Sequence, residues 1–195
     1  MNSLFISKYR PAIILTLALT VFLTSCKLFT KSWVVSTLAG SGEWGYKDAT
    51  GTVAQFYGPS SVAVDSSGNV YVADSGNNRI RKITPEGTVS TFAGRGRGYK
   101  DATGTAAQFY GPSGVAVDTS GNLYVADSGN NRIRKITPEG TVSTLAGSGE
   151  WGYKDATGTA AQFYHPHGVA VDSSGNVYVA EYLSLIHISE PTRPY

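Results

Sequence analysis

Cysteine is almost absent from this sequence, histidine is rare, and the net charge is small. The 195 residues include one cysteine and three histidines. A single cysteine excludes a disulfide within the chain, so the fold has to be held together by packing. A zinc site needs at least three protein ligands, and the chain has only four histidines and cysteines together to contribute to one.

An excess of positive charge is also lacking. Of the 16 basic residues, five lie outside the central part of the chain, as does one of the 14 acidic residues, so that the central part is left near −2. Proteins that bind a phosphate backbone carry a basic patch or stripe. We therefore predict no nucleic-acid partner, and we expect the arginines and lysines of Arg79–Lys82 and Arg132–Lys135 to be solvated and salt-paired.

The longest apolar stretch, residues 12–23, is too short to span a membrane as a helix. It follows Lys8 and Arg10, as in a signal peptide, and it ends in LTSC. LTSC resembles a bacterial lipobox, which implies a signal peptide over 1–25, lipidation of Cys26 and an anchor linker over 26–33. The resemblance implies export and lipid anchoring to the bacterial cell envelope, at the outer membrane or the cell surface. The alternative is a plain secretory signal followed by an incidental cysteine.

The end of the sequence departs from the rest. Residues 183–193, LSLIHISEPTR, resemble a sequencing adapter translated in frame. We therefore expect 183–195 to be an adapter-derived tail and exclude His187 from functional arguments. A divergent natural tail is the alternative.

A repeat of 53 to 54 residues organises the middle of the chain, marked by Asp65, Asp118 and Asp172. Two copies are complete and two are partial, and each complete copy contains four β-rich runs, separated by the turn sequences DSSGN, DSGNN and TPEGT or close variants. Four antiparallel strands in a unit too small to bury its own faces are typical of a β-propeller blade. In RIRKI the apolar residues Ile80 and Ile83 are three apart, which predicts either a bulge or one outward-facing isoleucine.

The repeat GVAVDxxGNxYVADxxNNRIxKI resembles the NHL repeat. The resemblance covers nearly all of Val34–Ala180 and implies an all-β fold, a partial β-propeller of four-stranded antiparallel blades spanning 34–182. Because such rings commonly have about six blades, it also implies that the chain is truncated. Residues 34–38, VVSTL, match the fourth strand of a unit.

Strand direction assigns the loops to two faces. The turns DSSGN and TPEGT share one face, and DSGNN shares the other with the long crossover between units. Long polar loops with aromatic residues on a rigid scaffold are the usual place for recognition. Residues kept in every crossover are interpreted as structural, with the tyrosine fixing the loop and the phenylalanine packed between blades: Tyr46, Lys47, Asp48, Phe56 and their counterparts.

Positions that vary between crossovers are the candidates for ligand binding. Glu43 and Trp44 are replaced by Arg95 and Arg97 and return as Glu150 and Trp151. Exposed Trp and Arg are favoured at binding hot spots, although ordinary loop drift explains the same variation. The predicted binding residues are Trp44, Arg95, Arg97 and Trp151.

The sequence favours a binding module for a protein, peptide or glycan over an enzyme. No catalytic residue, cofactor or metal site is predicted. The alternative is a metal-dependent lyase or lactonase that uses the central channel, since His165 and His167 in HPHG resemble the metal-binding blade starts of a peptidyl-amidating lyase. Two histidines do not complete such a site.

Overall fold

The computed structural model describes residues 33–189. The chain divides into two compact units, Met1–Ser36 and Thr37–Tyr195. The expected signal peptide and Cys26 lie outside the described residues, so both assignments stay predictions. In the first unit, residues 33–36 form no regular secondary structure and are exposed. No helix within 33–189 is long and apolar enough to cross a membrane.

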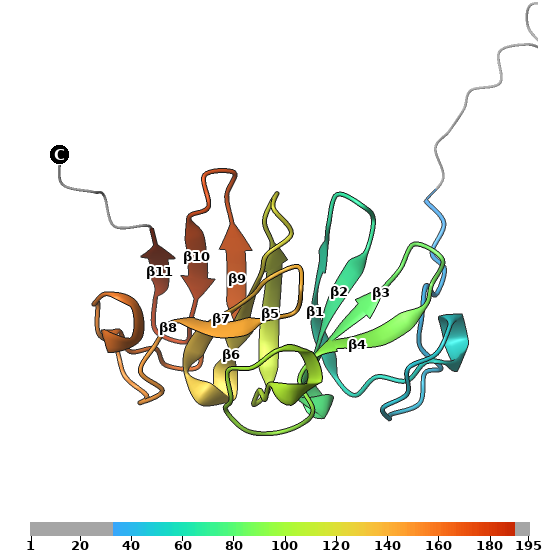
Figure 1. The fold of residues 1–195 in the computed structure, drawn as a ribbon, viewed down its shortest axis with the longest axis horizontal. Coiled ribbons are helices and arrows are strands. Elements are labelled where there is room, and N and C mark those ends of the chain that lie inside the picture. The colour runs from blue at the N-terminus through green and yellow to red at the C-terminus, as the bar shows by residue number, and fades with distance from the viewer. Residues whose placement is uncertain (1–32, 190–195) are drawn as a thin grey trace, which may run out of the picture. The chain divides into compact units, whose positions relative to one another are not determined.

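The second unit consists of three antiparallel sheets (Figure 1). The first two sheets have four strands each and the third has three within the described residues. This confirms the expected all-β class and partial propeller. The strands are β1 (Pro59–Val64), β2 (Val70–Asp74), β3 (Arg79–Ile83), β4 (Val89–Ala93), β5 (Pro112–Val117), β6 (Leu123–Asp127), β7 (Arg132–Ile136), β8 (Val142–Ala146), β9 (Gly168–Val171), β10 (Val177–Ala180) and β11 (Leu185–Ile188). Short 3₁₀ turns are η1 (Gly51–Val53), η2 (Ser75–Asn77), η3 (Gly104–Ala106), η4 (Ser128–Asn130) and η5 (Gly158–Ala160).

An aspartate fixes the first hairpin of each sheet. Asp65 Oδ1 accepts hydrogen bonds from the backbone N–H groups of Ser67 and Asn69, both at 2.9 Å. Gly68 supplies the positive φ of 81° that closes the turn. The Tyr71 hydroxyl donates to Asp65 Oδ2 at 3.3 Å, and burial together with this neighbouring carboxylate raises the pKa of Tyr71 to about 12.

The RIRKI segment buries both isoleucines. The pairing of β3 with β4 shifts register between Ile80 and Arg81, which leaves Phe92 as an extra residue of β4, a β-bulge. Ile80 belongs to the core between the first and second sheets, whereas Ile83 belongs to a cluster on the opposite face. The bulge that the sequence allowed is present, and both isoleucines are buried, Ile80 against the second sheet and Ile83 in a cluster that includes Ala54 of the crossover.

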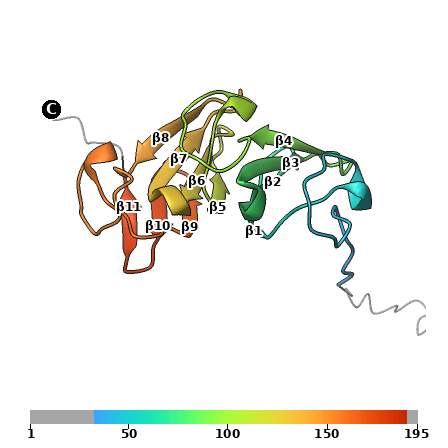
Figure 2. The ribbon, with the colours of Figure 1, turned by 90° about the horizontal axis from the view of Figure 1, so that it is seen from below.

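Neighbouring sheets share their cores. Phe109 and Val115 of the second repeat pack against Tyr71 and Ile80 of the first, and Phe163 packs in the same way between the second and third sheets. The inner strands β1, β5 and β9 lie on one side of this row, and the outer strands β4 and β8 lie on the other (Figure 2). Phe109 and Phe163 therefore have the structural role that the sequence predicted for the crossover phenylalanine.

Strand β11 lies within the expected adapter-derived tail. It pairs antiparallel with β10, where β3 and β7 pair with β2 and β6. His187 stacks on Tyr178 with ring centroids 5.0 Å apart. This placement does not test the origin of residues 183–195, which stays a prediction.

Candidate binding site in the crossover loops

Each crossover loop folds back as a narrow hairpin along the outer edge of its sheet. Lys47 bridges Gln55 in antiparallel fashion, and Thr50 bridges Thr88 in the TPEGT turn. The Val89 N–H of β4 donates to the Ala49 carbonyl at 2.9 Å. The prediction that the crossover is confined to one face is therefore wrong for its middle part. Pairing with β4 draws that part towards the opposite face and covers an otherwise open strand edge.

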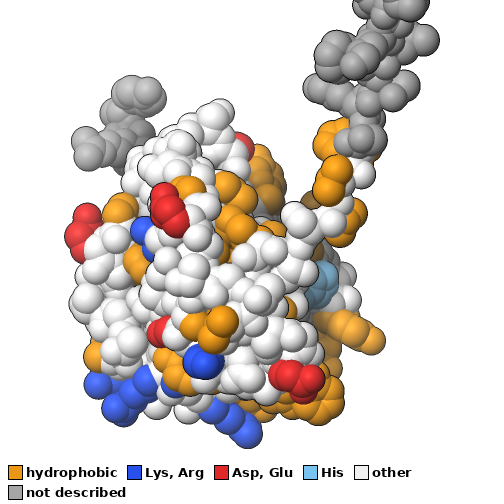
Figure 3. Space-filling model, turned by 90° about the vertical axis from the view of Figure 1, so that its right-hand side faces the viewer, with side chains coloured by type: hydrophobic (Ala, Val, Ile, Leu, Met, Phe, Trp, Pro, Cys, Tyr) orange, Lys and Arg blue, Asp and Glu red, His pale blue; other side chains and the backbone are white. Residues whose placement is uncertain are grey.

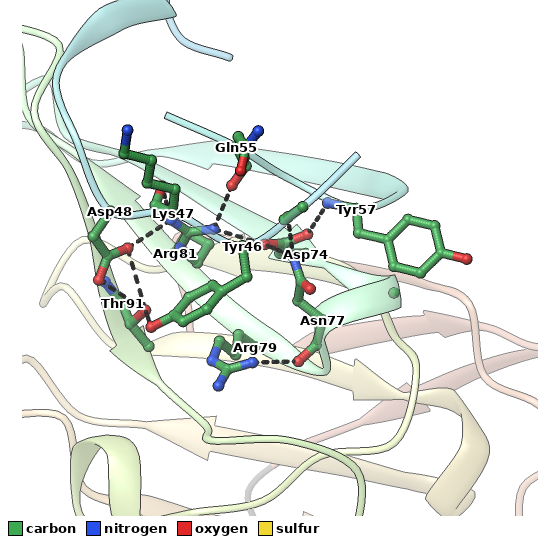
Figure 4. Close-up of polar contacts among 12 residues, drawn as sticks. Tyr46, Lys47, Asp48, Gln55, Tyr57, Asp74, Asn77, Arg79, Arg81 and Thr91 are labelled. Carbon is green, nitrogen blue, oxygen red and sulfur yellow. Dashed lines mark hydrogen bonds and ion pairs between the residues drawn. The ribbon is translucent and has the colours of Figure 1, made fainter. Parts of the chain in front are cut away.

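A buried arginine anchors this hairpin (Figure 4). Arg81 Nη1 donates to Asp74 Oδ2 at 2.8 Å and to the Gln55 carbonyl at 3.0 Å. Its Nη2 donates to Asp48 Oδ1 at 2.6 Å and to the Lys47 carbonyl at 3.0 Å. A buried guanidinium is tolerated only where such partners replace its water.

The second sheet repeats this arrangement with Arg134, Asp101 and Asp127. Both arginine side chains are fully buried. The expectation of solvated arginines is therefore wrong for Arg81 and Arg134, although the expected salt pairing is present. They are buried because the crossover folds over them and supplies a second carboxylate. These arginines are structural and are not available to a ligand.

The crossover tyrosine lies over a second arginine. The Cζ of Arg79 is 3.9 Å from the ring centroid of Tyr46, whose hydroxyl is 2.8 Å from Thr91 Oγ1. Arg132 and Tyr99 repeat the contact at 3.8 Å. Tyr46 and Tyr99 thus fix the loop to the sheet, as the sequence predicted.

Trp44, Arg97 and Trp151 occupy equivalent positions in the three crossovers. Each forms a parallel bridge with the crossover phenylalanine of its own repeat: Phe56, Phe109 and Phe163. Trp44 and Trp151 are 83% and 73% exposed. Three of the four predicted binding residues are therefore presented in the same way by successive repeats.

Each of these side chains lies against the tyrosine that follows the phenylalanine. The rings of Trp44 and Tyr57 are 5.9 Å apart, and those of Trp151 and Tyr164 are 6.1 Å apart. In the middle repeat the Arg97 guanidinium lies 4.1 Å from the centroid of the Tyr110 ring. Sequence reasoning missed these tyrosines, although QFY recurs in every copy.

Arg95 stands apart from this set. Its backbone N–H donates to the Ala107 carbonyl at 3.2 Å, just as the Ser41 N–H donates to Ala54 at 2.9 Å. Arg95 therefore replaces Ser41, and the position of Glu43 is the one lost in the shorter copy. The side chain of Arg95 is exposed on the same loop, and its carbonyl accepts a hydrogen bond from Arg79 Nη2 at 2.8 Å.

The two histidines of HPHG are exposed at the start of the third sheet. His165 has a φ of 49°, at the position where Gly58 and Gly111 have 58° and 57°. Its ring packs edge-on against Tyr164, with centroids 4.9 Å apart. Within residues 33–189 no group of three or more His, Cys, Asp or Glu side chains is placed to hold a metal ion.

Comparison with known proteins identifies the repeats. The NHL repeat matches residues 56–83, 109–136 and 163–182. NHL repeat-containing protein 2 of Homo sapiens is 32% identical over 160 residues, which are 73% of this chain and 22% of the human protein. The Gallus gallus protein of the same name is 40% identical over 94 residues, which are 47% of this chain and 13% of that protein. The chain thus spans less than a quarter of either relative.

Solved structures show the same fold. A protein of unknown function from Bacteroides thetaiotaomicron superposes with a TM-score of 0.60 at 28% identity, over 72% of this chain and 36% of the other. An auxiliary nutrient binding protein from the same organism superposes with a TM-score of 0.53 at 21% identity, over 62% and 34% of the two chains. The chain is thus an NHL-repeat protein whose described residues form part of a β-propeller.

Proposed function

We propose that this chain is a binding module that holds a protein, peptide or glycan against its crossover loops. The proposal rests on one arrangement that recurs in three successive repeats. In each, an exposed Trp44, Arg97 or Trp151 lies against the tyrosine that follows the crossover phenylalanine. Large exposed aromatic rings offer contact area at low conformational cost, and Trp, Tyr and Arg are the residues most often found at hot spots. An isolated exposed Trp needs no explanation, but the same position used in three repeats favours recognition.

The rigidity of the loops supports this function. In the first two crossovers the hairpin is fixed by the buried Arg81 or Arg134 and by the tyrosine that lies over Arg79 or Arg132. A side chain on a fixed backbone loses little entropy when it binds. Arg95 adds an exposed positive charge beside Arg97, which suits an acidic or polyhydroxylated ligand. The auxiliary nutrient binding protein of similar fold is in keeping with a binding role.

We propose further that the module is exported and lipid-anchored through Cys26. This part rests on the LTSC sequence after a short apolar segment. A lipid-anchored module would present its loops to ligands outside the cytoplasm.

Binding is tested with labelled full chain on an array of soluble glycans and on a displayed peptide library. We expect Trp44→Ala and Trp151→Ala each to weaken the selected interaction about 30-fold, which corresponds to a hot-spot contribution of about 2 kcal/mol. The melting temperature should not change, because both indoles are exposed. Matched substitutions Ser66→Ala, Thr119→Ala and Ser173→Ala lie in the turns between the first two strands of each sheet and should leave binding unchanged. Equal losses from both sets would refute the assignment of the binding face.

A further inference from the structure

The loop position shared by Trp44, Arg97 and Trp151 is exposed even where a sheet lies on both sides. The second sheet shares its core with the first sheet and with the third. Arg97 of this middle repeat is nevertheless exposed, and so is Arg95 on the same loop. The equivalent positions of the other two repeats therefore belong to the same solvent-facing surface.

Hydrogen bonds join the three loop positions into one row. The Gly76 N–H donates to the Tyr57 carbonyl at 2.8 Å. Asn78, at the end of the same turn η2, accepts a hydrogen bond from the Gly111 N–H at 2.8 Å through its Oδ1, and Gly111 directly follows Tyr110. The same links join the second repeat to the third: Tyr110, Gly129, Asn131 and His165. The three positions therefore keep fixed places relative to one another.

The charge of the loop reverses in the middle of this row. Glu43 precedes Trp44 in the first loop, and the third loop repeats this pair, whereas the middle loop has no glutamate and carries two arginines. The exposed charged residues are, in order, Glu43, Arg95, Arg97 and Glu150. Within the described part of the chain, none of these four forms an ion pair. A ligand that runs along the row thus meets a carboxylate, two guanidinium groups and a second carboxylate.

The lysine kept in every crossover does not change this order. Lys47 recurs as Lys100 and Lys154, so it adds the same charge to each loop. Its ammonium group also lies far from the Tyr57 ring (Figure 4). Seen from the side that carries the first sheet, exposed hydrophobic side chains lie beside acidic and basic ones near the lower edge (Figure 3). Aromatic and charged groups are therefore available together on this surface.

The outer two loops carry the chemistry that binds a cation. The indole is the aromatic ring that attracts ammonium and guanidinium groups most strongly. The Glu43 N–H donates to Ser41 Oγ at 3.2 Å, which fixes the backbone that leads into Trp44. Glu150 has the same bond to Ser148 Oγ at 3.2 Å. A carboxylate next to an exposed indole suits a lysine or arginine side chain.

The middle loop carries the chemistry that binds an anion. The Arg97 guanidinium lies 4.1 Å from the centroid of the Tyr110 ring, so the ring face holds its position. Stacking leaves the edge N–H groups of a guanidinium available to a carboxylate. Arg95 adds a second exposed guanidinium on the same loop. The middle loop therefore suits an aspartate or glutamate side chain.

We propose that the row binds an extended peptide segment in which a basic, an acidic and a second basic residue face the first, second and third loops. This inference rests on the proposed function of the crossover loops and adds the order of charges that the ligand carries. A glycan offers hydroxyl and acidic groups, which suit Arg97 but leave Glu43 and Glu150 without a counter-charge. Complementary charges fix the register of a ligand and exclude wrong partners.

The dimensions of the fold set the spacing of the charged residues in the peptide. Stacked sheets lie about 10 Å apart, and an extended chain covers about 3.3 Å per residue. The basic and acidic residues of the ligand should therefore lie at least about three positions apart.

Fluorescence anisotropy of labelled synthetic peptides with the full chain tests the order of charges. Each peptide contains two lysines and one glutamate, separated by Gly and Ser spacers of about two to six residues. We expect the order Lys–Glu–Lys to bind at least about tenfold more tightly than the order Lys–Lys–Glu. The two peptides have the same composition and net charge, so the difference reports the register of charges alone.

Charge reversal in the middle loop supplies a second test. Arg95→Glu combined with Arg97→Glu should invert the preference, so that a peptide with three lysines binds more tightly than Lys–Glu–Lys. The matched control is Lys82→Glu combined with Lys135→Glu, which makes the same change in net charge on β3 and β7 and should leave the preference unchanged. Melting temperatures of both double variants show whether they are folded.

The outcomes separate this inference from the proposed function. Equal affinity of the unaltered chain for the two orders of charge overturns the inference, and so does the same inversion in the control pair, which would assign the preference to net charge. Binding of a glycan while no peptide binds also overturns it, but leaves the proposed function intact if Trp44→Ala weakens that binding. Failure of every peptide and glycan to bind refutes both.

Discussion

Arg81 contacts Asp48 across 33 residues of sequence, with its Nη2 atom 2.6 Å from the carboxylate Oδ1. The arginine lies on a buried strand, and the aspartate lies on the exposed crossover. Asp48 Oδ2 in turn accepts a hydrogen bond from the Thr91 N–H of β4 at 3.1 Å. One ion pair therefore joins the core, the loop that carries Trp44 and the outer strand of the sheet.

We expect Arg81→Met to lower the free energy of unfolding by about 3 kcal/mol or more, because it leaves the buried Asp74 carboxylate without its cation. Chemical unfolding followed by circular dichroism measures the effect. Lys82→Met, one residue further along β3, is the matched control and should cost less than about 1 kcal/mol. Adding Asp74→Asn to Arg81→Met should recover part of the loss. If the double variant is less stable than Arg81→Met alone, the loss does not come from an unpaired carboxylate.

The repeat and its turns could be predicted from the sequence because they depend on neighbouring residues. Asp65 and Gly68 lie within one hairpin, and their spacing alone indicates its geometry. The burial of Arg81 could not be predicted in this way, since Asp48 and Lys47 reach it only after the crossover has folded back. Because the crossover folds back along β4, its middle part lies near the TPEGT turn and not on the face with DSGNN, where the sequence placed it. The contact between Trp44 and Tyr57 could have been predicted from the sequence, because QFY recurs in every crossover and places Tyr57 directly after Phe56.

Asp118 makes the stability of the hairpin depend on pH. Burial raises the pKa of its carboxyl group, but hydrogen bonds from Asn122, Tyr124 and Ser120 outweigh this effect and hold the pKa below the ordinary value of 3.8. The folded chain therefore binds this proton more weakly than the unfolded chain. The stabilisation is complete above the ordinary pKa and is lost as the pH falls through the lower, folded value.

We expect Asp118→Asn to reduce the loss of unfolding free energy between about pH 5 and about pH 3. At neutral pH the variant is less stable than the unaltered chain, since the neutral amide accepts weaker hydrogen bonds. Denaturant unfolding at several pH values measures both effects. An unchanged pH dependence would show that Asp118 does not carry this linkage.

The proposed lipidation of Cys26 predicts how the chain partitions between the membrane and soluble fractions of the producing cells. Lipid attachment adds about 0.8 kcal/mol of membrane affinity for each buried methylene, so several acyl carbons give stable anchoring. We expect the unaltered chain in the membrane fraction and Cys26→Ser in the soluble exported fraction. Unchanged fractionation of the variant would mean that the cysteine is incidental.

Tyr99 and Tyr153 occupy the same position in successive crossovers but have different partners. The Arg132 guanidinium lies 3.8 Å from the centroid of the Tyr99 ring, and the Tyr99 hydroxyl is 3.0 Å from Thr144 Oγ1. The third sheet supplies neither contact to Tyr153 within residues 33–189, and this ring is 60% exposed. The two tyrosines therefore form a matched pair that differs in the contacts with Arg132 and Arg134 and in one hydrogen bond.

We expect Tyr99→Ala to lower the free energy of unfolding by about 2 kcal/mol, from the combined loss of the cation–π contact and the hydrogen bond. Tyr153→Ala should cost less than about 1 kcal/mol, because an exposed ring without partners contributes little. Tyr99→Phe keeps the ring over Arg132 and should fall between the two. Urea unfolding of the three variants measures these differences. Equal losses at Tyr99 and Tyr153 would mean that the tyrosine stabilises the loop through backbone packing, and that Arg132 plays no part in fixing it.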